Sequence, residues 1–146
     1  MTNTPFSVYK YSLAKPINIA PMESLIIEPK SNTPYIKFDY STGIMDLKGR
    51  STPENSVEYY DPILSWLDQY KNEPKPKTIV NVQFEYFNTS SSKCILDVLK
   101  KFVLIHKAGN DVVVNWYYEE EDEDMQEAGE DYSDILDVPF NILPVE

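Results

Sequence analysis

The clearest pattern in the chain is the alternation of apolar and polar residues over positions 78–86. Val80, Val82, Phe84 and Tyr86 would share one face of a β-strand, and polar side chains would occupy the other face. A strand covered by helices on both sides is apolar throughout, so strict alternation indicates a sheet with one covered face. We therefore predict a sheet with helices mainly on one side.

Similar short runs predict the other strands. Gly43 supplies the glycine that a hairpin loop favours, so the second and third strands should form a hairpin. The last strand contains Pro139, which is tolerated at a sheet edge but not in the centre of a sheet. The predicted strands are 25–28, 35–38, 44–47, 78–86, 111–118 and 138–142.

Apolar residues at helical spacing predict three helices between the later strands. The first is expected to begin at Ser51, with Glu54 completing a capping box and Pro53 in the first turn. The second ends at Gly109, and the third covers the acidic run 119–131. The predicted inward-facing residues are Val57, Tyr60, Ile63, Leu64, Trp66, Leu67 and Tyr70 in the first helix, Ile95, Val98, Leu99 and Phe102 in the second, and Met125 and Ala128 in the third.

The resulting order of elements is β-ββ-α-β-α-β-α-β, which predicts the α/β fold class. Strand–helix–strand units require parallel strands and right-handed connections, so the sheet should be mixed. Residues 23–146 are predicted to form a single domain. Residues 1–22 contain three Pro and have no clear period, so we expect an N-terminal extension that pairs as an edge or stays mobile.

Charge is distributed unevenly along the chain. The formal net charge is −11, and residues 111–146 contain 13 Asp and Glu but no Lys or Arg. Such a surface repels phosphate backbones, so we expect no binding to nucleic acid or to anionic membranes. The acidic run is either a docking face for a basic partner or a solvated helix, and the sequence leaves both readings open.

Little in the sequence indicates catalysis or a cofactor. No apolar run is long enough to span a membrane, and no signal-peptide pattern is present, so we expect a cytoplasmic protein. Cys94 and His106 are the only residues of their types, which leaves no disulfide and no plausible metal or cofactor site. We expect Cys94 to be a core residue and His106 to contact a helix C-terminus, so a small hydrolase with a hydroxyl nucleophile is the weakest alternative.

A cluster of small polar residues, Asn88, Thr89, Ser90 and Ser91, follows the alternating strand and precedes the second helix. The first backbone N–H groups of a helix have no intrahelical partner, so such a junction can hold a phosphate. Asn, Ser and Thr are also the usual N-cap residues, so an ordinary helix cap is the alternative interpretation.

Four segments of the chain together resemble the SiaC family of bacterial regulatory phosphoproteins. The resemblance extends from Ser24 to Phe140 and implies a fold similar to that of the STAS-class anti-sigma factor antagonists. The segments that carry it are 31–34 (SNTP), 49–56 (GRSTPENS), 86–93 (YFNTSSSK), and 116–118 (WYY) with the acidic run that follows.

The resemblance implies a phosphorylation switch in a bacterial partner-switching pathway. Thr89 corresponds to the phosphoacceptor, which implies a Ser/Thr protein kinase and a metal-dependent Ser/Thr phosphatase as partners. The unphosphorylated form would bind and activate an effector such as a diguanylate cyclase. Asn88 and Ser91 stand where antagonists commonly have Asp and Gly, which weakens any link to a sigma-factor system.

The residues around Thr89 are expected to form its partner-binding surface. Asn88, Ser90 and Ser91 flank the predicted phosphoacceptor, whereas Glu54 and Asn55 would either join this surface or simply cap the first helix. A phosphate adds about −1.5 to −2 charges, which would disrupt a complex fitted to a small hydroxyl group. The remaining alternative is a STAS-like module that senses a nucleotide or another small ligand at this helix start.

Overall fold

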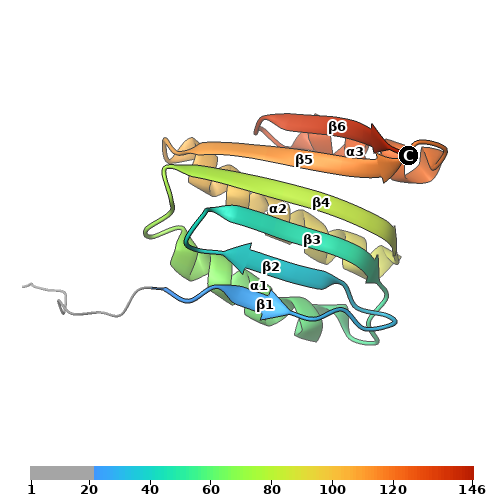
Figure 1. Cartoon of the computed structure of the whole chain (residues 1–146), viewed down its shortest axis with the longest axis horizontal. Coiled ribbons are helices and arrows are strands. Elements are labelled where there is room, and N and C mark those ends of the chain that lie inside the picture. The colour runs from blue at the N-terminus through green and yellow to red at the C-terminus, as the bar shows by residue number, and fades with distance from the viewer. Residues whose placement is uncertain (1–21) are drawn as a thin grey trace, which may run out of the picture.

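The computed structural model describes residues 22–146 as a six-stranded sheet with three helices on one face (Figure 1). The strands lie side by side in chain order. The first two pairings are antiparallel and the last three are parallel. The elements are β1 Leu25–Ile27, β2 Tyr35–Asp39, β3 Ile44–Ser51, α1 Ser56–Tyr70, β4 Lys77–Phe87, α2 Thr89–Lys107, β5 Asp111–Glu119, α3 Glu123–Ile135 and β6 Phe140–Val145.

The alternating pattern of the strands produces two layers, as predicted. Side chains on one face of the sheet are buried beneath the helices, whereas those between them are partly exposed on the opposite face. The predicted mixed α/β fold with one covered face is confirmed. The largest fully buried side chains are Trp116, Tyr60, Tyr70, Phe38, Phe102, Ile36, Met45, Leu47, Ile63, Leu67, Ile95 and Leu99.

Each parallel pair of strands is joined by one helix. The helix α1 connects β3 to β4, α2 connects β4 to β5, and α3 connects β5 to β6. The predicted edge strand is present as β6, but it begins after Pro139 and contains Pro144 instead. Its parallel pairing with β5 adds a third strand–helix–strand unit. This arrangement brings the carboxyl ends of β3, β4, β5 and β6 to one edge of the sheet (Figure 1, right).

The predicted start of the first helix is wrong. Ser51 does not cap a helix but ends β3, where it pairs with Phe87 of β4 and is fully buried. The N-cap of α1 is Asn55, whose side chain accepts a hydrogen bond of 3.1 Å from the N–H of Glu58. Val57, predicted to face inward, is 75% exposed because it lies beside the buried stripe of α1, which runs through Ser56, Tyr60, Ile63, Leu67 and Tyr70.

The prediction that Tyr86 faces the core is also wrong, because the pairing between β3 and β4 shifts near this residue. Gly49 pairs with Phe84 but Arg50 pairs with Tyr86, which leaves an additional residue in β4. Tyr86 is therefore 49% exposed, with the Arg50 guanidinium carbon 5.3 Å from its ring centroid. Phe87 takes the inward place instead, and its ring lies 6.3 Å from that of Trp116.

The third helix begins later than predicted, with Asp122 as its N-cap. Met125 is buried and Ala128 packs against the core, as predicted. Cys94 is a core residue, also as predicted, and burial raises the pKa of its thiol. His106 Nδ1 forms no hydrogen bond within residues 22–146, so the expected side-chain contact with the helix end is not seen.

The predicted N-terminal extension, residues 1–22, lies outside the described residues except for Met22, which packs against the core. Among the helices of residues 22–146, none combines the length and apolar character needed to cross a membrane.

Candidate functional site

The candidate site lies where two parallel strands end and two helices begin. Ser51 and Phe87 pair at the ends of β3 and β4, and the N–H of Asn88 donates a hydrogen bond of 3.1 Å to the Ser51 carbonyl. The helices α1 and α2 follow these strands after a few residues. Their N-termini therefore come together at the edge of the sheet where the parallel strands end (Figure 1).

Asn88 is the N-cap of α2, and Thr89 is the first residue of the helix. The Asn88 side chain accepts a hydrogen bond of 2.9 Å from the N–H of Ser91, and its carbonyl accepts one of 3.0 Å from the N–H of Ser92. The capping role considered for this cluster thus belongs to Asn88. Thr89 is exposed, and its Oγ1 forms no hydrogen bond with another residue of the described chain.

Beneath Thr89, a network of hydroxyl groups links the two helix starts. We call Ser51, Ser56, Tyr60, Ser90 and Ser91 the hydroxyl network. Ser51 Oγ lies 2.7 Å from the Tyr60 hydroxyl and donates to Ser91 Oγ at 2.9 Å. Ser56 Oγ lies 2.8 Å from Ser90 Oγ and 3.4 Å from Ser91 Oγ.

The hydroxyl network has a structural role, because most of its members are buried and cannot be reached by a partner protein. Ser51, Tyr60 and Ser91 are fully buried and Ser56 is only 4% exposed, whereas Ser90 is exposed. The Tyr60 hydroxyl is neutral at physiological pH and available as a hydrogen-bond donor, and burial raises its pKa further above that range. The network fixes the start of α2 against β3 and α1.

The first turn of α2 is also tied to α3. Ser92 Oγ donates a hydrogen bond of 2.6 Å to the Thr89 carbonyl, and the Tyr132 hydroxyl donates one of 2.8 Å to the Ser92 carbonyl. This donor is protonated at physiological pH, and burial raises the pKa of Tyr132 further above that range. Thr89 is thus an exposed side chain on a backbone that is held from several sides.

The structure brings the predicted site residues to one place. Asn88, Thr89, Ser90 and Ser91 form the start of α2. Glu54 and Asn55 are exposed and directly precede Ser56, whose hydroxyl bonds to Ser90 at 2.8 Å. Asn55 acts as the N-cap of α1, so the capping interpretation holds for it.

Three members of the hydroxyl network are not among the site residues predicted from the sequence. The local sequence predicts a helix cap for Ser51 and a core position for Tyr60, and it predicts no role for Ser56. The parallel order of β3 and β4 carried a usable signal, because residues that follow neighbouring parallel strands lie at the same edge of a sheet. The hydroxyl residues at the end of β3 and at the starts of α1 and α2 could therefore have been predicted to lie close together.

The dipole of α2 favours an anion at Thr89. A helix N-terminus carries a partial positive charge, and the first turn of α2 contains no acidic residue to offset it. The first turn of α1, by contrast, contains Glu58. Within residues 22–146, no three His, Cys, Asp or Glu side chains are grouped so that they could hold a metal ion.

Comparison with known proteins gives consistent results. The model of the SiaC family of regulatory phosphoproteins matches residues 27–145. An uncharacterized protein of Pseudomonas aeruginosa strain UCBPP-PA14 is 29% identical over 121 residues, which cover 83% of this chain and 96% of that protein.

Two solved structures extend the comparison to the fold. The crystal structure of apo-SiaC from Pseudomonas aeruginosa matches with a TM-score of 0.77 and 28% identity, over 84% of this chain and 99% of that one. A second structure shows the diguanylate cyclase SiaD in complex with its activator SiaC from the same organism. It matches with a TM-score of 0.78 and 28% identity, over 83% and 99% of the two chains.

Proposed function

Because this chain belongs to the SiaC family of regulatory phosphoproteins, we propose that Thr89 is its phosphoacceptor and controls binding to a diguanylate cyclase. In the unphosphorylated state, the surface around Thr89 binds the cyclase and activates it. Phosphorylation of Thr89 by a Ser/Thr protein kinase separates the two proteins, and a metal-dependent Ser/Thr phosphatase restores the binding form.

The observation that carries this proposal is the contrast between Thr89 and its neighbours. Thr89 is exposed, and no other residue of the described chain forms a hydrogen bond with its hydroxyl. Ser90 Oγ is engaged by Ser56 and Asn88, and Ser91 is fully buried. Among Thr89, Ser90 and Ser91, only Thr89 therefore offers a kinase an exposed hydroxyl group without a partner in residues 22–146, which favours it as the acceptor.

The same geometry supports a switch that acts on the partner and leaves the fold intact. A phosphate on Thr89 adds about −1.5 to −2 charges at a helix N-terminus, where negative charge is favourable. A partner surface fitted to a hydroxyl group would have to accommodate and desolvate a dianion, which weakens the complex. Glu54 and Val57 are exposed at the neighbouring start of α1 and belong to this proposed surface.

The proposed effector follows from the solved relative, in which SiaC is the activator of the diguanylate cyclase SiaD. We propose that this chain itself catalyses no reaction. Cys94 is buried with a raised pKa, which disfavours the reactive thiolate form. His106 lies in the last turn of α2, at the end of the helix opposite to Thr89.

The test compares the wild-type chain with Thr89→Asp for binding and activation of the diguanylate cyclase from its own organism. The wild-type chain should bind and raise cyclase activity, whereas Thr89→Asp should bind at least about tenfold more weakly, a difference of about 1.4 kcal/mol. Equal affinity of the two chains would contradict the proposal.

The matched control is Ser65→Asp, which places the same charge on an exposed residue in the middle of α1. This variant should bind and activate the cyclase as the wild-type chain does. A loss as large as that of Thr89→Asp would show that added charge alone, irrespective of position, disrupts the complex.

A further inference from the structure

The face of the sheet opposite the helices carries a row of four side chains, one from each of four adjacent strands. Tyr35 pairs with Lys48, and Lys48 pairs with Gln83. The pairing of Val82 with Trp116 then brings Tyr117 beside Gln83. We call these four residues the tyrosine row. Neighbouring strands are about 4.8 Å apart, so the two tyrosines stand about 14 Å from each other.

A second row, parallel to the first, is held by a ladder of side-chain hydrogen bonds. The amide of Asn81 donates to Asp46 at 3.1 Å, Asn115 donates to Asn81 at 3.1 Å, and Asn141 donates to Asn115 at 3.0 Å. This ladder fixes the orientation of each amide. Gln83, in the tyrosine row, is not part of this ladder. Its amide forms no hydrogen bond to another residue of 22–146.

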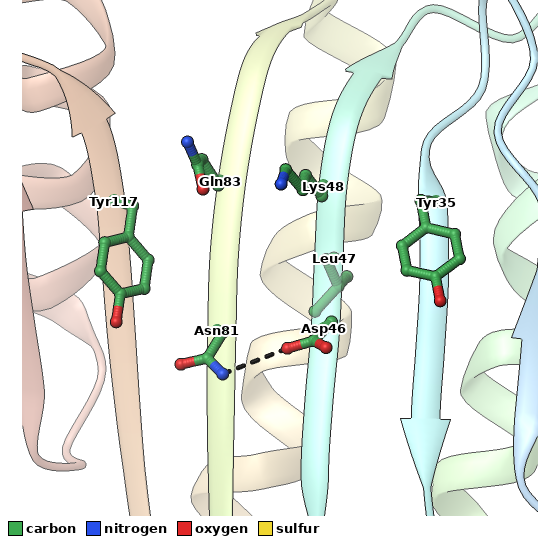
Figure 2. Close-up of a pocket in the computed structure, with 7 residues that line it drawn as sticks. All are labelled: Tyr35, Asp46, Leu47, Lys48, Asn81, Gln83 and Tyr117. Carbon is green, nitrogen blue, oxygen red and sulfur yellow. Dashed lines mark hydrogen bonds between the residues drawn. The ribbon is translucent and has the colours of Figure 1, made fainter. Parts of the chain in front are cut away.

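The tyrosine row, together with Asp46 and Asn81 of the ladder, lines a hollow of about 270 Å³ on the open face of the sheet. Figure 2 shows Tyr35 and Tyr117 on its two sides with their rings lying broadly along the sheet, and Lys48 and Gln83 between them. The amide of Gln83 is directed towards the Tyr117 side of the hollow (Figure 2). The volume of this hollow lies just below the range of about 300–1,000 Å³ that is usual for small-molecule pockets, so it suits a single compact ligand.

We propose that this hollow binds an adenine mononucleotide. The adenine base stacks on the ring of Tyr117, as bases stack on aromatic side chains displayed by the strands of a sheet. The free amide of Gln83 donates one hydrogen bond to the base and accepts another, which is the bidentate pairing that Gln forms with adenine. The ammonium group of Lys48 binds the phosphate.

Charge and size select this ligand over other occupants. Lys48 and Asp46 are the only charged residues that line the hollow, so it is neutral in a chain with a net charge of −11. A polynucleotide would be repelled by the rest of the molecule, whereas a mononucleotide needs only one cation. The hollow lies on the sheet face turned away from the helices, so its occupancy does not depend on the proposed role of Thr89.

The test is calorimetric titration of the full chain with AMP, adenosine, GMP and ribose 5-phosphate. AMP should bind with a Kd of about 1 mM or tighter, and GMP at least about tenfold more weakly. Tyr117→Leu should weaken AMP binding about tenfold or more, whereas Tyr117→Phe should retain it. Lys48→Gln should weaken binding of AMP but not of adenosine. The matched control, Lys37→Gln, removes a cation from the same face outside the hollow and should leave AMP binding unchanged.

Several outcomes would overturn the proposal. These are the absence of saturable AMP binding, equal affinity for AMP and GMP, binding of ribose 5-phosphate as tight as that of AMP, and AMP binding that survives Tyr117→Leu. A change of oligomeric state in Tyr117→Leu without a change in AMP binding would instead identify this face as an interface between two copies. Thr89→Asp should bind AMP as the wild-type chain does, so failure of the phosphorylation switch would leave this test intact.

Discussion

Thr89 and Ser91 are two positions apart, yet their side chains have opposite environments. Thr89 projects from the first turn of α2 into solvent, and Ser91 is fully buried against Ser51. The difference follows from helical geometry, because residues two positions apart point to different sides of a helix. One short polar segment therefore supplies both an accessible hydroxyl group and a buried structural one.

Replacement of Ser91 should destabilise the fold more than replacement of Ser90. Ser91→Ala leaves the buried Ser51 hydroxyl without one of its two partners, and an incompletely bonded buried group costs about 1–3 kcal/mol. Ser90 is exposed, so Ser90→Ala should cost less than about 1 kcal/mol. Urea denaturation of both variants measures the difference, and equal costs would contradict the assignment of Ser91 to the buried network.

Thr89→Asp should not destabilise the protein. An acidic residue in the first turn of a helix interacts favourably with the helix dipole, which is worth about 0.3–1 kcal/mol. The free energy of unfolding in urea should therefore be unchanged or slightly higher than in the wild-type chain. A loss of more than about 1 kcal/mol would mean that weaker effector binding by this variant reflects damage to the fold.

At the scale of elements, one contact between α3 and the sheet leaves no room for a side chain. Gly129 faces Trp116, and an added Cβ would lie 2.7 Å from Nε1 and 2.9 Å from Cγ of its indole ring. Trp116 is fully buried, and its Nε1 donates a hydrogen bond of 3.0 Å to the Met125 carbonyl. The absence of a side chain at Gly129 thus allows the acidic helix to lie against β5.

Gly129→Ala should therefore destabilise the protein, although alanine is the better helix former by about 1 kcal/mol. Overpacking against a fully buried indole typically costs about 1–3 kcal/mol and should exceed that gain. Thermal unfolding measures the result, with the exposed Glu127→Ala as a control that should change stability by less than about 0.5 kcal/mol. An increase in stability of Gly129→Ala would show that α3 can shift away from the sheet.

Local patterns predicted the elements well and their ends less well. Alternation in β4 predicted a sheet with one covered face, since burial on one side acts directly on every second residue. The pattern did not show that β3 continues to Ser51 or that the register shifts near Tyr86, because both depend on pairing between β3 and β4. Ser51 therefore lies in β3, where the local sequence predicts a helix cap.

At the scale of the whole molecule, the parallel order of the strands creates the candidate site. The junction after β4 could be predicted from the sequence because its polar residues are contiguous. The contribution of Ser51 and Ser56 could not be predicted from one segment, because their contacts with Ser90 and Ser91 join residues 34 to 40 positions apart.

The most direct test of the phosphorylation switch is the affinity of the diguanylate cyclase for two forms of this chain, one with Thr89 unmodified and one with phosphothreonine at position 89. The unmodified form should bind the cyclase and raise its activity. The phosphorylated form should bind at least about tenfold more weakly, because the dianion must be desolvated in the interface. Equal affinity of the two forms, both folded, would contradict the account.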